Sequence, residues 1–178
     1  MTPPPDTATP PRASAVLIPL TQIEGRLTVL FTVRRADLKV HGGEVSFPGG
    51  AVEAGDTSCV ATALRETQEE IQLAPQCVEV LGELTPLYIP PTHYRVHPVI
   101  GWIPRLPPLT PNRCEVDHIL QVPLAHLLDR ETVRRERWAL EDRTVTVPYF
   151  QADGWPIWGA TAMILNELLV LTNWILKA

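Results

Sequence analysis

The sequence predicts one α/β domain built on a mixed sheet flanked by a few helices. Segments rich in β-branched residues outnumber helical segments, and some of these strands follow one another through short turns. The chain has 178 residues, which suits one domain, and 45% of them are apolar, enough to form a core. Strands joined partly by hairpins and interrupted by helices indicate a mixed sheet with helices packed on it.

The N-terminal stretch MTPPPDTATPPR differs from the rest of the chain. It lacks the apolar core of a signal peptide, and its prolines favour disorder or polyproline conformation. We therefore expect a disordered proline-rich tail over residues 1–12 and a single folded domain over residues 13–178.

The first strands are expected over residues 13–20 and 25–35, both rich in aliphatic and β-branched side chains. Gly25 between them indicates a turn, so the two strands are expected to form a hairpin. A polar loop over residues 36–43 leads to a short strand over 44–47, which the sequence PGG ends.

The clearest helix follows this loop. Asp56, Thr57 and Ser58 are candidate N-caps. Core-facing positions then recur at helical spacing; they are Val60, Ala63, Leu64, Thr67 and Ile71. Pro75 ends the helix because it disfavours helical backbone at Ala74.

Further strands alternate with loops in the second half of the chain. The expected strands span residues 78–84, 86–89, 94–103, 118–124 and 144–150. Residues 104–113 are expected to form a proline-rich loop, residues 125–129 a short helix, and residues 160–176 the last helix. Asn166 and Glu167 interrupt that apolar helix, which is too short and too polar to span a bilayer.

Composition and missing motifs exclude several classes of function. The net charge of −5 argues against a general nucleic-acid binder. Cys59, Cys77 and Cys114 have neither metal-site spacing nor an even count for disulfides, which favours free thiols in a reducing, cytoplasmic setting. The sequence contains no G-x-x-x-x-G-K-[ST], H-E-x-x-H or C-x-x-C motif.

The helix carries the acidic sequence RETQEE, residues 65–70. At about 100° per residue, Glu69 and Glu70 lie about 60° and 40° to either side of Glu66, so all three share one stripe. Like charges at this spacing destabilise a helix by roughly 0.2–0.5 kcal/mol per pair. Either solvent covers the stripe or a cation binds it; a solvated face usually alternates charges, and Arg65 is the nearby cation.

The loop before the helix favours the cation. Gly49 and Gly50 lie just upstream, and glycine lets a backbone carbonyl approach a metal closely. Carboxylates and carbonyls are the hard oxygen ligands that Mg²⁺ takes, together with substrate phosphates. A glycine loop followed by an acid-striped helix therefore predicts a divalent metal site that acts on a phosphoryl group.

Residues 49–73, GGAVEAGDTSCVATALRETQEEIQL, resemble the Nudix box, G-x5-E-x7-R-E-U-x-E-E-x-G-U, where U is aliphatic. The R-E-x-x-E-E core is matched by Arg65, Glu66, Glu69 and Glu70. The chain departs from the box at Asp56 in place of Glu, at Thr67 and at Gln72 in place of Gly, and it has one additional residue before Arg65. The resemblance implies a Nudix α/β/α sandwich with a mixed sheet between helices.

A second segment indicates a narrower class of substrates. Residues 30–50, LFTVRRADLKVHGGEVSFPGG, resemble the additional signature of Nudix coenzyme A pyrophosphatases, L-L-T-x-R-S-x3-R-x3-G-x-V-x-F-P-G-G. Arg34 matches it, and Lys39 keeps the charge of an arginine position. Residues 157–162 are similar to a segment common in the same group. Arg34 and Lys39 are therefore expected to contact the phosphates of the substrate.

The resemblance implies hydrolysis of the pyrophosphate bond of coenzyme A or a derivative, which gives 3′,5′-ADP and 4′-phosphopantetheine or its acyl form. It assigns Mg²⁺ or Mn²⁺ to Glu66, Glu70 and the Gly49 carbonyl, and Glu69 to the metal or the attacking water. Arg65 and Gly50 would support the site. Two alternatives stay open: hydrolysis of another nucleoside diphosphate derivative, such as ADP-ribose or a dinucleotide, and a non-catalytic nucleotide-binding module.

Glu115, in NRCEVDHILQVPL, is a further candidate. Nudix enzymes often supply an additional acid from a loop after the box, as a base or a metal ligand, and the context of Glu115 resembles that element. From the residues alone, a glutamate after a proline-rich loop is equally compatible with an exposed surface position. No nucleic-acid or membrane partner is expected, and the oligomeric state and acyl preference are left open.

Overall fold

The computed structural model describes residues 9–38, 41–140 and 143–175. Most of the expected tail, residues 1–8, lies outside the described part, and the first strand begins at Arg12. The strands are β1 (Arg12–Ile23), β2 (Arg26–Arg34), β3 (Val45–Ser46), β4 (Gly49–Ala51), β5 (Glu79–Glu83), β6 (Leu87–Ile89), β7 (Tyr94–Ile103), β8 (Val116–Pro123), β9 (Val133–Leu140), β10 (Arg143–Ala152) and β11 (Trp155–Ile157). The helices are α1 (Cys59–Ile71), α2 (Leu124–Leu128) and α3 (Gly159–Ile175), with short 3₁₀ turns η1 (Pro75–Cys77) and η2 (Arg130–Thr132).

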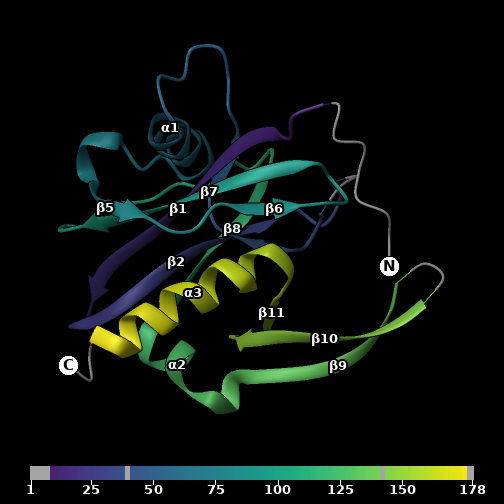
Figure 1. Cartoon of the computed structure of the whole chain (residues 1–178). Helices are drawn as coiled ribbons and strands as arrows, with labels where there is room; N and C mark the ends of the chain where they lie inside the picture. The colour runs from purple at the N-terminus through teal and green to yellow at the C-terminus, as the bar shows by residue number, and fades with distance from the viewer. Residues whose placement is uncertain (1–8, 39–40, 141–142, 176–178) are drawn as a thin grey trace.

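The main sheet lies between two other layers (Figure 1). Its central strands are β2, β1 and β7, with β8 beside β2 and both β5 and β6 beside β7. β1 and β7 pair parallel, whereas the other neighbours pair antiparallel, so the sheet is mixed. α1 covers one face, and α2, α3 and the small β11–β10–β9 sheet cover the other. The predicted sheet between helices is confirmed.

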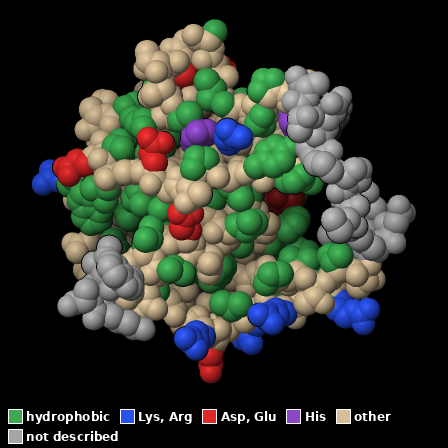
Figure 2. Space-filling model, viewed as in Figure 1, with side chains coloured by type: hydrophobic (Ala, Val, Ile, Leu, Met, Phe, Trp, Pro, Cys, Tyr) green, Lys and Arg blue, Asp and Glu red, His purple; other side chains and the backbone are tan. Residues whose placement is uncertain are grey.

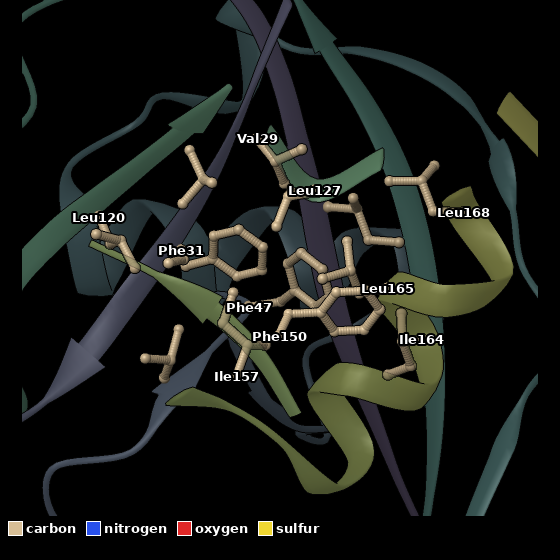
Figure 3. Packing of buried hydrophobic residues seen from close by; sticks show 14 of the residues in the cluster. Val29, Phe31, Phe47, Leu120, Leu127, Phe150, Ile157, Ile164, Leu165 and Leu168 are labelled. Carbon is tan, nitrogen blue, oxygen red and sulfur yellow. The ribbon is translucent and has the colours of Figure 1, made fainter. Parts of the chain in front are cut away.

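Two hydrophobic clusters fill the spaces on either side of the sheet. The cluster beneath α3 includes Phe31 and Phe47, whose stacked rings lie 4.8 Å apart, and Phe150 and Leu165 pack beside them (Figure 3). The cluster beneath α1 joins Ala63 and other side chains of the helix to β1, β2 and β7. Burying one large apolar side chain contributes about 1.5–3 kcal/mol, so these clusters fix α1 and α3 on opposite faces.

The β1–β2 hairpin opens to admit the glycine loop. The strands pair from Leu20 and Val29 to the turn, where Gly25 has a φ of 77°, and they diverge at their other ends. β3 pairs with β2 and β4 pairs with β1 inside the gap. A Cβ added to Gly49 would lie 2.3 Å from the Ala15 carbonyl oxygen, so only glycine allows β4 to pair this closely.

The small sheet contains two strands that the sequence patterns did not predict, β9 and β11. β9 has the sequence VRRERWAL, in which exposed arginines break any apolar alternation. Its backbone nevertheless pairs with β10 along its full length, and the Tyr149 hydroxyl donates to Glu136 Oε1 at 2.7 Å. Basic side chains gather over this sheet in Figure 2. Tertiary pairing overrides the weak strand propensity of this charged segment.

The last helix follows its prediction closely. Its Glu167 side chain accepts hydrogen bonds from the Thr85 amide at 3.1 Å and the Thr85 hydroxyl at 2.8 Å, which attach α3 to the β5–β6 connection. Among the residues described, no helix is both long enough and apolar enough to cross a membrane.

Candidate active site

Helix α1 supports the acidic residues, and its two ends have distinct caps. Ser58 is the N-cap among the three candidates, because its hydroxyl accepts the Ala61 amide at 3.1 Å. The helix ends at Gln72, which has a left-handed φ of 58° and donates its amide to the Gln68 carbonyl. Glycine adopts this conformation without steric strain, and glycine is the residue that the Nudix box has at the position of Gln72.

Arg65 and Asp56 join the helix to the glycine loop. Arg65 Nε lies 3.0 Å from Asp56 Oδ1, and Nη2 lies 3.0 Å from Oδ2. Nη2 also donates to the Ala51 carbonyl at 3.1 Å. Asp56 accepts further hydrogen bonds from the Glu53 amide and the Thr62 hydroxyl, both at 2.8 Å. The Arg65 hydrogen bonds hold the pKa of Asp56 well below its usual range, and Asp56 in turn raises the pKa of Arg65.

The same guanidinium also faces two of the helix glutamates. Arg65 Nη1 lies 3.0 Å from Glu66 Oε1 and 3.1 Å from Glu69 Oε2. Glu69 is exposed, whereas Glu66 is half-buried against the glycine loop. A Cβ added to Gly50 would lie 2.4 Å from Glu66 Oε1, so the absent side chain leaves room for this carboxylate. Burial raises the pKa of Glu66.

Glu70 lies in very different surroundings, because only 4% of its surface is exposed. Its pKa is raised to about 8, first by burial and then by the negative charges of Glu115 and Glu66, while Arg34 and the Gly49 backbone act to lower it. Arg34 Nη1 lies 3.9 Å from Glu70 Oε1, beyond hydrogen-bond distance. Glu70 Oε2 and Arg34 Nε are buried and have no hydrogen-bond partner among the described residues.

The loop before β8 brings Glu115 to this group. The Asn112 amide donates to the Glu70 carbonyl at 2.7 Å, and the Thr110 amide donates to the Ile71 carbonyl at 3.1 Å, so the loop follows the end of α1. The Glu115 amide then donates to the Asn112 carbonyl at 2.9 Å. The exposed Glu115 side chain lies near enough to Glu66 and Glu70 to raise the pKa of both.

The chemistry of the carboxylates fits a divalent cation, although the side chains do not form a compact cluster. In the described ranges, no three His, Cys, Asp or Glu side chains are gathered closely enough to hold a metal ion. The unpartnered Glu70 Oε2 and the Glu66 carboxylate above Gly50 are nevertheless hard oxygen donors. Burial raises the pKa of both glutamates, and an added positive charge would oppose that effect.

The structure places most of the expected site residues together. Arg65 contacts Glu66 and Glu69. Glu115 lies close enough to raise the pKa of Glu66 and Glu70, and Lys39 lies outside the described residues. The contact between Arg34 and Glu70 was not expected from the sequence, where Arg34 is predicted to contact substrate. The pairing of β2 with β8 shifts register between Val33 and Arg34, and this irregularity leaves no trace in the strand pattern.

A surface hollow adjoins this group, and no pattern in the sequence indicates it. Its volume is ≈ 320 Å³, and it is lined by Arg35, Ala36, Asp37, Arg113, Val116 and Asp117. Arg35 Nη1 donates to the Arg113 carbonyl at 2.7 Å, and the Arg35 amide donates to the Glu115 carbonyl at 2.9 Å. The hollow therefore shares its backbone with the loop that carries Glu115.

Comparisons with known proteins agree with this geometry. The family model described as the NUDIX domain matches residues 11–143. A relative from Photorhabdus laumondii subsp. laumondii is 37% identical over 157 residues, which are 88% of this chain and 83% of the relative. A relative from Salmonella paratyphi B is 38% identical over 157 residues, 88% of this chain and 81% of its own. Both bear the name uncharacterized Nudix hydrolase NudL.

Solved structures share the fold. The Nudix hydrolase RenU from M. smegmatis has a TM-score of 0.65 at 18% identity, covering 94% of this chain and 89% of its own. The NUDIX domain of Shewanella oneidensis NrtR, complexed with ADP ribose, has a TM-score of 0.52 at 20% identity, covering 70% and 80%. The family match and the relatives establish that the chain belongs to the Nudix family, as a pyrophosphohydrolase acting on a nucleoside diphosphate derivative.

Proposed function

We propose that the protein hydrolyses the pyrophosphate bond of coenzyme A or one of its derivatives, with Mg²⁺ or Mn²⁺ as cofactor. The products would be 3′,5′-ADP and 4′-phosphopantetheine or its acyl form. The observation that carries the proposal is the similarity of residues 30–50 to the signature of Nudix coenzyme A pyrophosphatases. That segment supplies both Arg34 and the glycine loop, which meet the acidic face of α1 from one side.

The proposed metal ligands are Glu66, Glu70 and the Gly49 carbonyl. When bound, the ion would polarise a phosphoryl oxygen and lower the pKa of a coordinated water. Glu69 would complete the ligand set or orient the attacking water, which requires its carboxylate to leave Arg65 Nη1, 3.1 Å away. Glu69 is exposed and free to turn, whereas Arg65 would keep its two hydrogen bonds to Asp56.

Glu115 is the proposed additional acid. It is exposed on the loop that follows the end of α1, and its charge acts on Glu66 and Glu70. A carboxylate in this position could accept a proton from the attacking water. The hydrogen bonds of Asn112 to α1 and of Glu115 to Asn112 would keep that loop in place during the reaction.

Recognition of three phosphates requires local cations, because the chain carries a net charge of −5. Arg65 is already held by Asp56, whereas Arg34 lies 3.9 Å from Glu70 without that restraint, and we assign Arg34, with Lys39, to the pyrophosphate. The hollow beside Glu115 adds Arg35 and Arg113, which we assign to the 3′-phosphate. Guanidinium groups suit this task because they bind phosphate oxygens in pairs.

A substrate panel with product identification tests the proposal. Coenzyme A, 3′-dephospho-coenzyme A, ADP-ribose and a diadenosine polyphosphate are each incubated with the enzyme and Mg²⁺ or Mn²⁺. We expect coenzyme A to have the highest kcat/KM and to release 3′,5′-ADP. Preference for ADP-ribose or the dinucleotide would assign the site to another nucleoside diphosphate derivative. Equal use of the two coenzyme A forms would remove the assignment of Arg35 and Arg113.

The role of Glu69 is tested separately, with matched substitutions of exposed glutamates. Glu69→Gln is expected to lower kcat by about 10²-fold or more, the loss that follows when a reacting group is misplaced by about 1 Å. Glu79→Gln, at an exposed position on the edge strand β5, removes the same charge and is expected to leave kcat unchanged. Near-normal turnover by Glu69→Gln would contradict its assignment.

A further inference from the structure

Arg34 and Glu70 form an incomplete ion pair. Their nearest charged atoms, Nη1 and Oε1, are 3.9 Å apart, and each residue keeps a buried atom without a hydrogen-bond partner in the described structure, Nε on Arg34 and Oε2 on Glu70. Buried polar atoms of charged groups normally form hydrogen bonds, because their desolvation is otherwise left uncompensated. Such an arrangement suits groups that exchange partners.

The other arginine of the site shows the contrast. Arg65 is bound by Asp56, by the Ala51 carbonyl and by two glutamates, at 3.0–3.1 Å. Releasing it would leave several acceptors unsatisfied. Arg34 has one distant carboxylate, and 28% of its side chain is exposed. Of these two guanidinium groups, Arg34 is therefore the one that can move toward a ligand without breaking a hydrogen bond.

The position of Arg34 explains how it comes to face Glu70. It is the last residue of β2, at the register shift in the pairing with β8. Such an irregularity redirects a side chain relative to the strand before it. The Arg34 amide and carbonyl are both bonded to the following loop, at Glu44 and Gly43, so the backbone stays fixed while the side chain is free to change partners.

We infer that Arg34 is an exchangeable counter-ion, which offsets the charge of the ionised Glu70 carboxylate until a divalent cation binds and then transfers to a phosphate of the substrate. The identity of that phosphate rests on the proposed function, but the exchange at Glu70 does not. Two positive charges compete for one buried carboxylate, so the guanidinium opposes cation binding while it stays there. A phosphate that binds Arg34 removes this opposition. By linkage, the cation then raises the affinity for the substrate, and the substrate raises the affinity for the cation by the same factor.

The test measures Mn²⁺ binding by calorimetry, without substrate, on protein stripped with a chelator and held at pH 8. Arg34→Gln is expected to bind Mn²⁺ at least about fivefold more tightly than the unaltered protein, the lower end of typical coupling between sites. The metal-free variant is also expected to melt at a lower temperature, because Glu70 loses its counter-ion. Neither effect depends on which nucleotide is hydrolysed, so failure of the proposed substrate would leave both in place.

Arg35→Gln is the matched control. It removes the same charge at the next residue, where the guanidinium is paired with Asp37 at 2.8 Å in solvent. We expect less than about a twofold change in Mn²⁺ affinity from this variant, since exposed charges are strongly screened. An equal gain in Mn²⁺ affinity in both variants would show that the effect comes from overall charge, and it would overturn the inference.

A second substitution protects the test against misfolding. Arg34→Met keeps the apolar stem of the side chain and is expected to tighten Mn²⁺ binding as Arg34→Gln does. Unchanged or weaker Mn²⁺ binding in folded Arg34→Met would show that Arg34 does not compete with the cation, and the inference would then be wrong.

Discussion

Three glutamates on one helical stripe have three different environments. Glu69 is exposed beside Arg65, Glu66 is half-buried above Gly50, and Glu70 is buried opposite Arg34. Arg65 faces Glu66 and Glu69, and Arg34 faces Glu70, so two guanidinium groups offset the repulsion expected along the stripe. At Glu70, burial is the largest cause of the raised pKa.

The raised pKa of Glu70 predicts how the stability of the metal-free protein depends on pH. Its folded pKa of about 8 exceeds the ordinary value of 4.5, so between these values the folded state holds a proton that the unfolded state has lost. Stability should therefore fall as pH rises through this window, by at most about 1.4 kcal/mol per pH unit from one proton. Asp56, whose pKa is lowered, acts only at more acidic pH.

Urea unfolding at several pH values between 5 and 8, in the presence of a chelator, checks this prediction. Glu70→Gln cannot ionise and should show a flatter dependence than the unaltered protein. The other ionisable groups are common to both proteins, so the difference between the two curves reports on Glu70. Parallel curves would show that Glu70 is not protonated in the folded state.

Replacing Gly50 by alanine is expected to lower the activity with little loss of stability. In Gly50→Ala the new Cβ would meet the Glu66 carboxylate at 2.4 Å, and the flexible end of that side chain can move away. Displacing a catalytic carboxylate by about 1 Å can lower kcat/KM by about 10²-fold. Gly55→Ala is the control, because nothing lies within 4 Å of its added Cβ. Equal activity in both variants would argue against a role for Glu66.

Helix α1 carries the acidic residues, and its two ends are capped differently. The N-terminus has a serine cap, whereas Gln72 adopts a left-handed conformation at the C-terminus. Gln72→Gly is expected to stabilise the protein by about 0.5–1 kcal/mol, because glycine adopts this conformation without steric strain. Gln68→Gly, within the same helix and also exposed, should destabilise by about 1 kcal/mol. Midpoints of urea unfolding measure both, and destabilisation by Gln72→Gly would contradict the prediction.

The β3–β4 segment is the element that assembles the site. It enters the opened end of the β1–β2 hairpin, and the Leu17 amide donates to the Pro48 carbonyl at 2.8 Å. The sequence predicted a short strand and a glycine turn here, but it gave no indication that the two strands of the hairpin separate to receive them. Pairing of this kind depends on residues that are far apart along the chain.

For the whole molecule, divalent cation binding should stabilise the fold. A cation bound at Glu66 and Glu70 would neutralise buried charge in the folded state alone, and a ligand at 100 times its Kd adds about 2.7 kcal/mol. For a chain of 178 residues this corresponds to a rise in Tm of roughly 5–10 °C. Thermal melting with Mg²⁺ and with a chelator measures it. Glu70→Gln should lose most of the shift, and identical Tm values in the unaltered protein would contradict the metal site.

Much of the architecture could be predicted from local patterns. The hairpin at Gly25, the helix after Ser58, the apolar final helix and most strands follow from periodicity, capping and turn residues, because those preferences act over a few residues. β9 could not be predicted in this way. Its arginines and Glu136 give no strand pattern, and pairing with β10 alone makes it a strand.

The family, the acidic stripe on α1 and the glycine loop before it can all be predicted from the sequence, because each depends on the spacing of neighbouring residues. The burial of Glu70, its position opposite Arg34 and the effect of Glu115 on its pKa arise only on folding. Burial and charge proximity depend on segments that meet in the folded chain. β2, the end of α1 and the loop before β8 are distant in the chain, and their packing gives one carboxylate of the stripe surroundings unlike the others.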